Sequence, residues 1–93
     1  MSTQVVVYTM KGCPYCVELK ELLVKENIEF VDRDIDEHEE EYDVFSKVVE
    51  NDYIPALLII NDGEEKLQSF LYAPERDYNE LTEAVDLIKK HLI

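Results

Sequence analysis

Apolar and polar residues follow two different periods along the chain, and together they predict seven elements. Short apolar or alternating runs indicate strands, whereas apolar residues spaced three and four apart indicate helices. The expected strands are residues 4–9, 28–34, 56–60 and 66–71. The expected helices begin at residues 14, 39 and 77. The predicted order is therefore β-α-β-α-β-β-α, in a single domain that covers residues 1–93.

Local signals indicate how neighbouring elements connect. The first strand, helix and second strand lie within residues 4–34, which predicts a right-handed βαβ unit with parallel strands. Asn61-Asp62-Gly63 is a strong hairpin signal, so the strands on either side of it are expected to be antiparallel. Asp77 and Glu80 have the spacing of a capping box, and we expect the last helix to begin at Asp77.

Acidic residues dominate the charged positions. The sequence holds 22 Asp and Glu against nine Lys and Arg, which gives a formal net charge of -13. Nucleic acids and anionic membrane surfaces both require clustered positive charge, so neither is an expected partner. A partner with a basic face would be attracted. We see no targeting segment and no apolar run long enough to span a bilayer, and therefore expect a cytoplasmic protein. We also expect it to be a monomer.

Two cysteines carry the chemistry that the sequence predicts. Cys13 and Cys16 lie where a strand passes into a helix, with Pro14 at the first helical position. Cys13 then falls at the N-cap, where the helix dipole and the N–H groups of Tyr15 and Cys16 stabilise a thiolate. We expect Cys13 to be the attacking nucleophile and Cys16, inside the helix, to resolve the mixed disulfide.

Charge acts on the Cys13 thiol in both directions. Lowering its pKa from about 8.5 to below 7 requires about 2 kcal/mol or more, whereas a helix dipole supplies about 0.3–1 kcal/mol. Hydrogen bonds from the backbone, together with Lys11, would have to supply the rest. The surrounding acidic residues oppose this effect.

Metal binding and inert core cysteines are the alternatives to redox chemistry. A structural zinc site needs four ligands, and only His38 and His91 remain, both in polar stretches. Asp32, Asp34 and Asp36 alternate as at the start of a calcium loop, but the glycine that such a loop needs is absent. We therefore expect no metal.

The residues around the cysteine pair resemble those of glutaredoxins. The similarity rests on Val7-Tyr8-Thr9, on Cys13-Pro14-Tyr15-Cys16, on Tyr53-Ile54-Pro55 before a strand, and on the order of the elements. This resemblance implies an α/β thioredoxin-like fold, in which a four-stranded mixed sheet is flanked by three helices. It also implies an oxidoreductase enzyme that reduces protein disulfides or glutathione mixed disulfides, with glutathione as the reductant.

The same resemblance implies positions that bind substrate. Pro55 matches the cis-proline of the family, which would leave the backbone of Ile54 free to pair with an extended substrate beside Cys13. Tyr15 would line the substrate groove. The basic residues and the Gly-Gly pair with which family members hold the two carboxylates of glutathione are not at their usual positions. The candidate replacements are Lys11, Arg76 and the helix start at Asp77–Tyr78.

Two further functions remain open at this point. The segment Tyr72-Ala73-Pro74-Glu75 resembles small redoxins that reduce ribonucleotide reductase and take electrons from thioredoxin reductase. A dedicated electron donor of that kind is therefore the alternative hypothesis. A third hypothesis is a carrier in which two copies share an iron–sulfur cluster through Cys13, although the stiffness of Pro14 opposes it.

Overall fold

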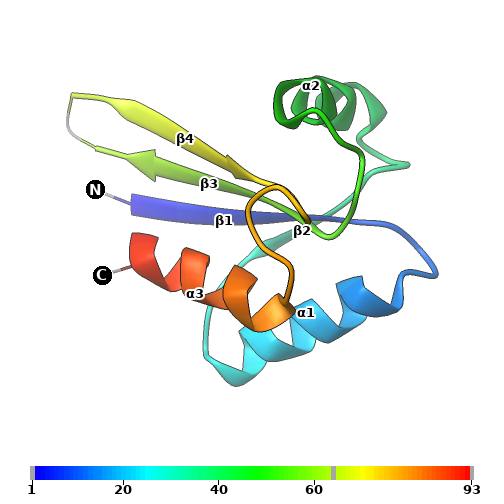
Figure 1. The fold of residues 1–93 in the computed structure, drawn as a ribbon. Coiled ribbons are helices and arrows are strands. Elements are labelled where there is room, and N and C mark those ends of the chain that lie inside the picture. Colours follow the sequence, from blue (N-terminus) through cyan, green and yellow to red (C-terminus); the bar gives the residue numbers. More distant parts are fainter. Residues whose placement is uncertain (1, 64, 93) are drawn as a thin grey trace.

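A twisted four-stranded sheet organises the computed structural model, which describes residues 2–63 and 65–92 (Figure 1). Three helices pack against this sheet. The strands are β1 (Ser2–Thr9), β2 (Val31–Asp34), β3 (Ala56–Asp62) and β4 (Leu67–Tyr72). The helices are α1 (Pro14–Lys25), α2 (Glu39–Val49) and α3 (Leu81–His91).

The strands lie in the order β2-β1-β3-β4. Strand β1 is parallel to β2 and antiparallel to β3, and β4 is antiparallel to β3. The parallel pair results from the βαβ unit, and the antiparallel edge results from the hairpin. The predicted element order and the predicted four-stranded mixed sheet of a thioredoxin-like α/β fold are both confirmed.

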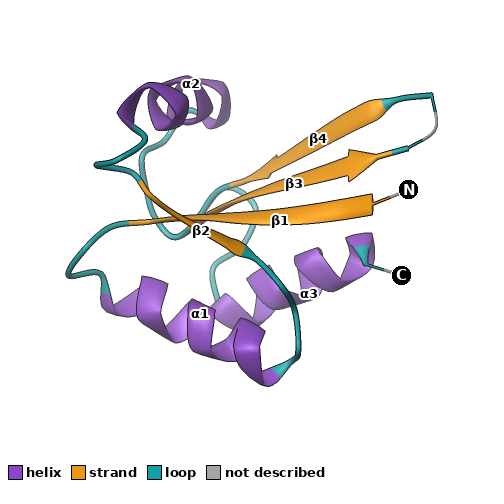
Figure 2. Cartoon of the chain, turned by 180° about the vertical axis from the view of Figure 1, so that it is seen from behind, coloured by secondary structure: helices purple, strands orange, loops and turns teal. Residues whose placement is uncertain are grey.

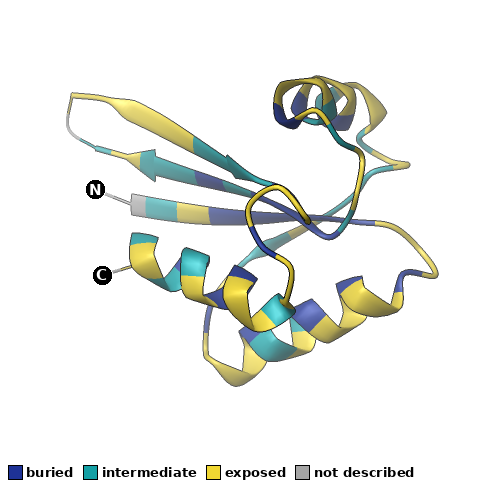
Figure 3. Cartoon of the chain, viewed as in Figure 1, coloured by how far each residue is buried: buried dark blue, intermediate teal, exposed yellow. Residues whose placement is uncertain are grey.

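Helices cover both faces of the sheet, with α1 and α3 on one side and α2 on the other (Figure 2). Strand β1 alternates between the two faces, so that Val5 and Val7 join the core under α1 and α3. Val6 and Tyr8 join the core under α2. This double coverage explains why the four consecutive residues from Val5 to Tyr8 are all apolar. The buried strand residues lie in β1 and β3, whereas β4 and the outer faces of the helices are largely exposed (Figure 3).

The second strand begins later than predicted, at Val31 instead of Ile28. Residues 26–28 instead close the end of α1: the N–H of Ile28 donates to the carbonyl of Leu23, and the N–H of Asn27 donates to that of Val24. Asn27 adopts a left-handed conformation with φ 57°. These features form a Schellman motif, in which an apolar residue after the turn packs back onto the helix. Ile28 is therefore apolar because it is buried there.

The last helix also begins later than predicted, at Leu81 instead of Asp77. The carboxylate of Asp77 closes a loop, because it accepts a hydrogen bond from the N–H of Ala73 at 2.8 Å. In return, the N–H of Asp77 donates to the carbonyl of Ala73 at 2.9 Å. The capping box is formed one turn later, between Glu80 and Glu83.

The hairpin turn lies slightly beyond Asn61-Asp62-Gly63. Asn61 and Asp62 are still paired in the β3–β4 ladder, opposite Gln68 and Leu67. Beyond this pair, the N–H of Gly63 donates to the carbonyl of Lys66 at 2.9 Å. Within the described part of the chain, no helix combines the length and the apolar composition needed to cross a bilayer.

Candidate active site

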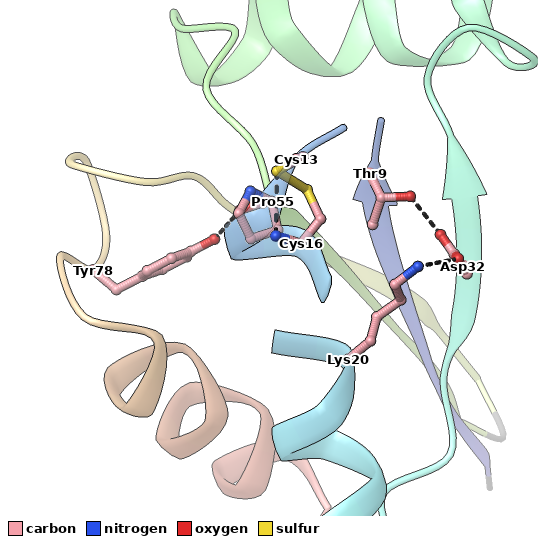
Figure 4. Close-up of a disulfide and its surroundings, with 7 residues drawn as sticks. All are labelled: Thr9, Cys13, Cys16, Lys20, Asp32, Pro55 and Tyr78. Atoms are coloured by element: carbon pink, nitrogen blue, oxygen red, sulfur yellow. Dashed lines mark hydrogen bonds and ion pairs between the residues drawn. A yellow bond between two sulfur atoms is a disulfide. The ribbon is translucent and has the colours of Figure 1, made fainter. Parts of the chain in front are cut away.

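Cys13 and Cys16 form a disulfide at the N-terminus of α1, with a Cα–Cα distance of 5.3 Å (Figure 4). Pro14 is the first helical residue, and Cys13 is the N-cap in an extended conformation. The N–H of Cys16 donates to Sγ of Cys13 at 3.2 Å. Of the two N–H groups predicted to face this sulfur, those of Tyr15 and Cys16, the structure confirms that of Cys16.

The two sulfurs differ in their access to solvent. Cys13 is 9% exposed, whereas Cys16 is 1% exposed and packs inside the first turn of the helix. Around Cys13 the chain is open, because Met10, Lys11 and Tyr15 are all exposed. A disulfide on another molecule can therefore approach Cys13 more readily than Cys16.

A groove of about 710 Å³ lies next to this end of α1, and we call it the tyrosine groove. Three segments line it: the first turns of α1, the residues before β3, and the loop that leads into α3. Three tyrosines, two prolines, three glutamates and several other side chains contribute. The lining residues include Tyr15, Glu18, Tyr53, Ile54, Pro55, Pro74, Glu75, Tyr78 and Glu80.

Tyr78 ties two of these segments together. Its hydroxyl donates a hydrogen bond to the carbonyl of Pro55, and Figure 4 shows its side chain pointing at that residue. Burial raises the pKa of Tyr78 well above its ordinary value, and the nearby negative charge of Asp77 adds to this effect. The hydroxyl therefore stays protonated and remains a donor. The Ile54–Pro55 peptide bond is cis, as the resemblance implied.

The predicted binding residues fall into two groups. Tyr15, Ile54 and Pro55 line the tyrosine groove. Lys11, Arg76 and Asp77 lie outside its lining. Arg76 instead forms an ion pair with Asp77 at 2.8 Å and donates to the carbonyl of Leu71 at 3.4 Å. The structure thus brings three of the six candidates together beside the cysteines.

Sequence reasoning missed the glutamates and the contact of Tyr78 with Pro55. Glu18 follows Tyr15 by three residues on α1, so the helical period alone could have placed it on the same face. Glu75, Tyr78 and Glu80 belong to a loop whose course depends on the Asp77 contacts. No signal in the linear sequence shows that this loop packs near Pro55.

A polar cluster lies on the other side of the disulfide in Figure 4. Asp32 accepts hydrogen bonds from the hydroxyl of Thr9 and from Nζ of Lys20, the latter at 2.8 Å. Partial burial raises the pKa of Asp32, but the hydrogen bonds from Lys20 and Thr9 and the charge of Lys20 outweigh it. The net effect lowers its pKa. The cluster connects β1, α1 and β2 near the loop that carries Cys13.

The described residues also bear on the calcium hypothesis. The carboxylates of Asp32 and Asp34 accept hydrogen bonds from protein groups, Asp34 from the N–H of Asp36 at 2.8 Å. Among residues 2–63 and 65–92, no three His, Cys, Asp or Glu side chains are grouped so that they could hold a metal ion.

A thioredoxin-like sheet with a cysteine pair at the start of the first helix defines the class of thiol–disulfide oxidoreductases. The sequence model of the family described as Glutaredoxin matches residues 5–64, more than half of the chain. The chain therefore belongs to the glutaredoxin family. Comparisons with curated proteins and with solved structures gave no match. The matched residues include both cysteines and Pro55, whereas Tyr78 and α3 lie beyond them.

Proposed function

We propose that this protein reduces disulfides in protein substrates through the dithiol form of Cys13 and Cys16. The observation that carries the proposal is the Cys13–Cys16 disulfide at a helix N-terminus, beside the tyrosine groove. The groove offers room for a polypeptide segment alongside Tyr15, which lies between the two cysteines in the sequence. Ile54 borders it just before β3 begins, so its backbone is a candidate partner for an extended substrate.

The reaction proceeds in two exchanges. The thiolate of Cys13 attacks one sulfur of the substrate disulfide, forms a mixed disulfide with it, and releases the other substrate sulfur as a thiolate. The thiolate of Cys16 then attacks Sγ of Cys13 and releases the second substrate thiolate. The dithiol loses two electrons, which reduce the substrate disulfide. The two protons given up by the cysteines are taken up by the two released thiolates.

The N-terminus of α1 promotes the first exchange. The N–H of Cys16 points at Sγ of Cys13, and the helix dipole places positive potential there. Both effects favour the thiolate that attacks. Both also stabilise Cys13 as the leaving group when the oxidised protein is reduced again.

Replacing each cysteine in turn tests the assignment of roles. With the protein reduced in advance and mixed with a disulfide-containing protein, we expect Cys13→Ser to lose all exchange. We expect Cys16→Ser to accumulate a mixed disulfide through Cys13, detectable by mass spectrometry. Accumulation of a mixed disulfide on Cys16 in the Cys13→Ser protein would contradict the proposed roles.

Glutathione is the first candidate for the reductant that regenerates the dithiol. Two glutathione molecules would be oxidised for each Cys13–Cys16 disulfide reduced. Membership of the glutaredoxin family supports this choice. Following the disulfide in a glutathione redox buffer, with alkylation and mass spectrometry, measures whether glutathione reduces it and at what potential.

The alternative is a dedicated electron donor for ribonucleotide reductase that thioredoxin reductase keeps reduced. The observation that favours it is that Pro74 and Glu75 line the tyrosine groove, since both belong to the segment that resembles such redoxins. Rapid reduction of the Cys13–Cys16 disulfide by thioredoxin reductase, together with slow reduction by glutathione, would support this alternative over the first.

A further inference from the structure

The tyrosine groove is negatively charged. Glu18 reaches it from α1, Glu75 from the loop after β4, and Glu80 from the start of α3. All three residues are exposed. The carboxylates of Glu18 and Glu75 are open to a bound ligand, whereas that of Glu80 belongs to the capping box of α3. Among the described residues that line the groove, none is Lys or Arg.

The start of α3, a place in the groove suited to an anion, is already occupied by the protein itself. A helix N-terminus offers free N–H groups that bind carboxylates, and α3 begins at the groove. Here, however, Glu83 accepts a hydrogen bond from the N–H of Glu80 at 2.9 Å, and Glu80 caps the N–H of Glu83. Glu83 also accepts from the N–H of Asn79 at 3.3 Å. Two carboxylates therefore occupy the site that a substrate carboxylate would need.

The basic residue of the loop before α3 is also engaged. Arg76 is held by Asp77 at 2.8 Å and by the carbonyl of Leu71. Asp77 is itself fixed by the N–H of Ala73. Moving Arg76 toward a ligand in the groove would break this connected set of contacts.

Two exposed aromatic rings complete the lining. Tyr15 is 65% exposed and Tyr53 is 52% exposed, and both border the groove. An aromatic face attracts a cationic side chain that lies over it. Aromatic rings among carboxylates are therefore a suitable surface for Lys or Arg side chains.

We propose that the tyrosine groove selects disulfides whose cysteines are flanked by Lys or Arg, and that it disfavours anionic disulfides such as that of glutathione. This inference rests on the proposed function, because disulfide exchange at Cys13 is the reaction whose substrate it names. While Cys13 attacks the substrate disulfide, the groove carboxylates attract a cationic substrate segment and repel an anionic one.

A matched series of peptides tests this selectivity in single-turnover reactions. Each peptide carries the same cyclic disulfide, and only the residues flanking its cysteines change, from Lys to Ser to Glu. Prereduced protein supplies the electrons, so no further reductant is needed. At low ionic strength, we expect the second-order rate constant of exchange to be about tenfold higher for the Lys peptide than for the Glu peptide. At about 0.5 M salt the ratio is expected to shrink, because exposed charges are screened.

Two variants distinguish the groove from the net charge of the whole molecule, which is -13. The double variant Glu18→Gln with Glu75→Gln removes two groove charges. The control Glu21→Gln with Asp86→Asn removes two exposed charges from the same protein, on α1 and α3 but outside the groove lining. We expect the first variant to reduce the ratio of the rate constants for the Lys and Glu peptides about threefold or more. The control should leave this ratio nearly unchanged.

The outcomes separate this inference from the proposed function. Equal rates for the three peptides, or a faster Glu peptide, would overturn the inference while leaving the oxidoreductase in place. An equal loss of preference in both double variants would also overturn it, since the selectivity would then come from net charge. Failure of the reduced protein to exchange with any peptide would instead overturn the proposed function.

Discussion

Cys13 has two roles that its position explains together. As the N-cap, its Sγ accepts a hydrogen bond from the N–H of Cys16. As one half of the disulfide, the same sulfur is bonded to Sγ of Cys16. Tyr78 similarly serves two segments, because it lies in the loop before α3 and donates to the carbonyl of Pro55. The site therefore depends on a small number of buried contacts between segments that are distant in the sequence.

Replacing Tyr78 with Phe tests the contact with Pro55. The change keeps the ring but removes the donor, so that a buried carbonyl loses its partner, which costs about 1–3 kcal/mol. We expect the free energy of urea unfolding to fall by this amount. The exposed Tyr53→Phe is the control and should change it by less than about 0.5 kcal/mol. Equal effects of the two substitutions would contradict the assigned role.

The Asp32 cluster predicts a dependence of stability on acid pH. Because folding lowers the pKa of Asp32, its contribution is present above the ordinary value of about 3.9 and is lost as pH falls through the lower folded value. Asp32→Asn should therefore flatten the loss of stability in this range, measured by urea unfolding at a series of pH values. Both partners are partly exposed, so the effect should stay below about 1 kcal/mol.

The same measurement in a Lys20→Gln protein tests whether Lys20 is responsible for the effect of Asp32. If the hydrogen bond and charge of Lys20 lower the pKa of Asp32, Asp32→Asn should have a smaller effect in a protein that already lacks Lys20. If Asp32→Asn has the same effect on stability with and without Lys20, Lys20 does not contribute to the lowered pKa of Asp32.

At the scale of the elements, local contacts close the end of α1 and the start of α3. The Schellman motif ends α1 and turns the chain into β2, and the capping box begins α3 at the tyrosine groove. These ends decide where the flanking loops run. The starts of α1 and α3 both border the groove, one with Tyr15 and the other with Glu80.

Asn27 is the residue on which the end of α1 depends most. Its positive φ suits Asn or Gly but is unfavourable for a residue with an ordinary Cβ. Asn27→Ala should lower the free energy of unfolding by about 1 kcal/mol, whereas Asn27→Gly should leave it nearly unchanged. Lys25→Ala, within the last turn of the helix, is the control. Equal losses for the Ala and Gly variants would contradict this account.

At the scale of the whole molecule, two apolar cores share one sheet while negative charge covers the surface. The core beneath α1 and α3 and the core beneath α2 both use side chains of β1 and β3. A large net charge of one sign opposes the compact state through self-repulsion. Burial of apolar surface on both faces of the sheet outweighs this repulsion.

Salt should therefore stabilise the protein as a whole. Screening weakens the repulsion among 22 acidic residues more than it weakens five partly exposed ion pairs. We expect Tm to rise by several degrees, about 3–8 °C, between low salt and about 0.5 M sodium chloride. A constant or falling Tm would show that the ion pairs, and not the net charge, dominate the surface electrostatics.

The matched family and the structure together explain how far the sequence could be interpreted. The order of elements, the place of the cysteines and Pro55 were all predictable. The boundaries at Ile28, Asn61 and Asp77 were not, because each depends on a competing contact. Ile28 closes a helix, Asn61 remains in a ladder, and Asp77 caps a loop instead of α3.

The sequence by itself determined what depends on neighbours along the chain: the periods of strands and helices, and the N-cap position of Cys13 ahead of Pro14. Only the tertiary structure decided which side chains form the groove at this end of α1. Glu18, Pro55 and Tyr78 are far apart in sequence, and their meeting in one groove depends on the packing of α1 and α3 against the sheet. Local hydrogen bonds and steric preferences act over a few residues, whereas the charge of a groove is the sum of segments that only folding brings together.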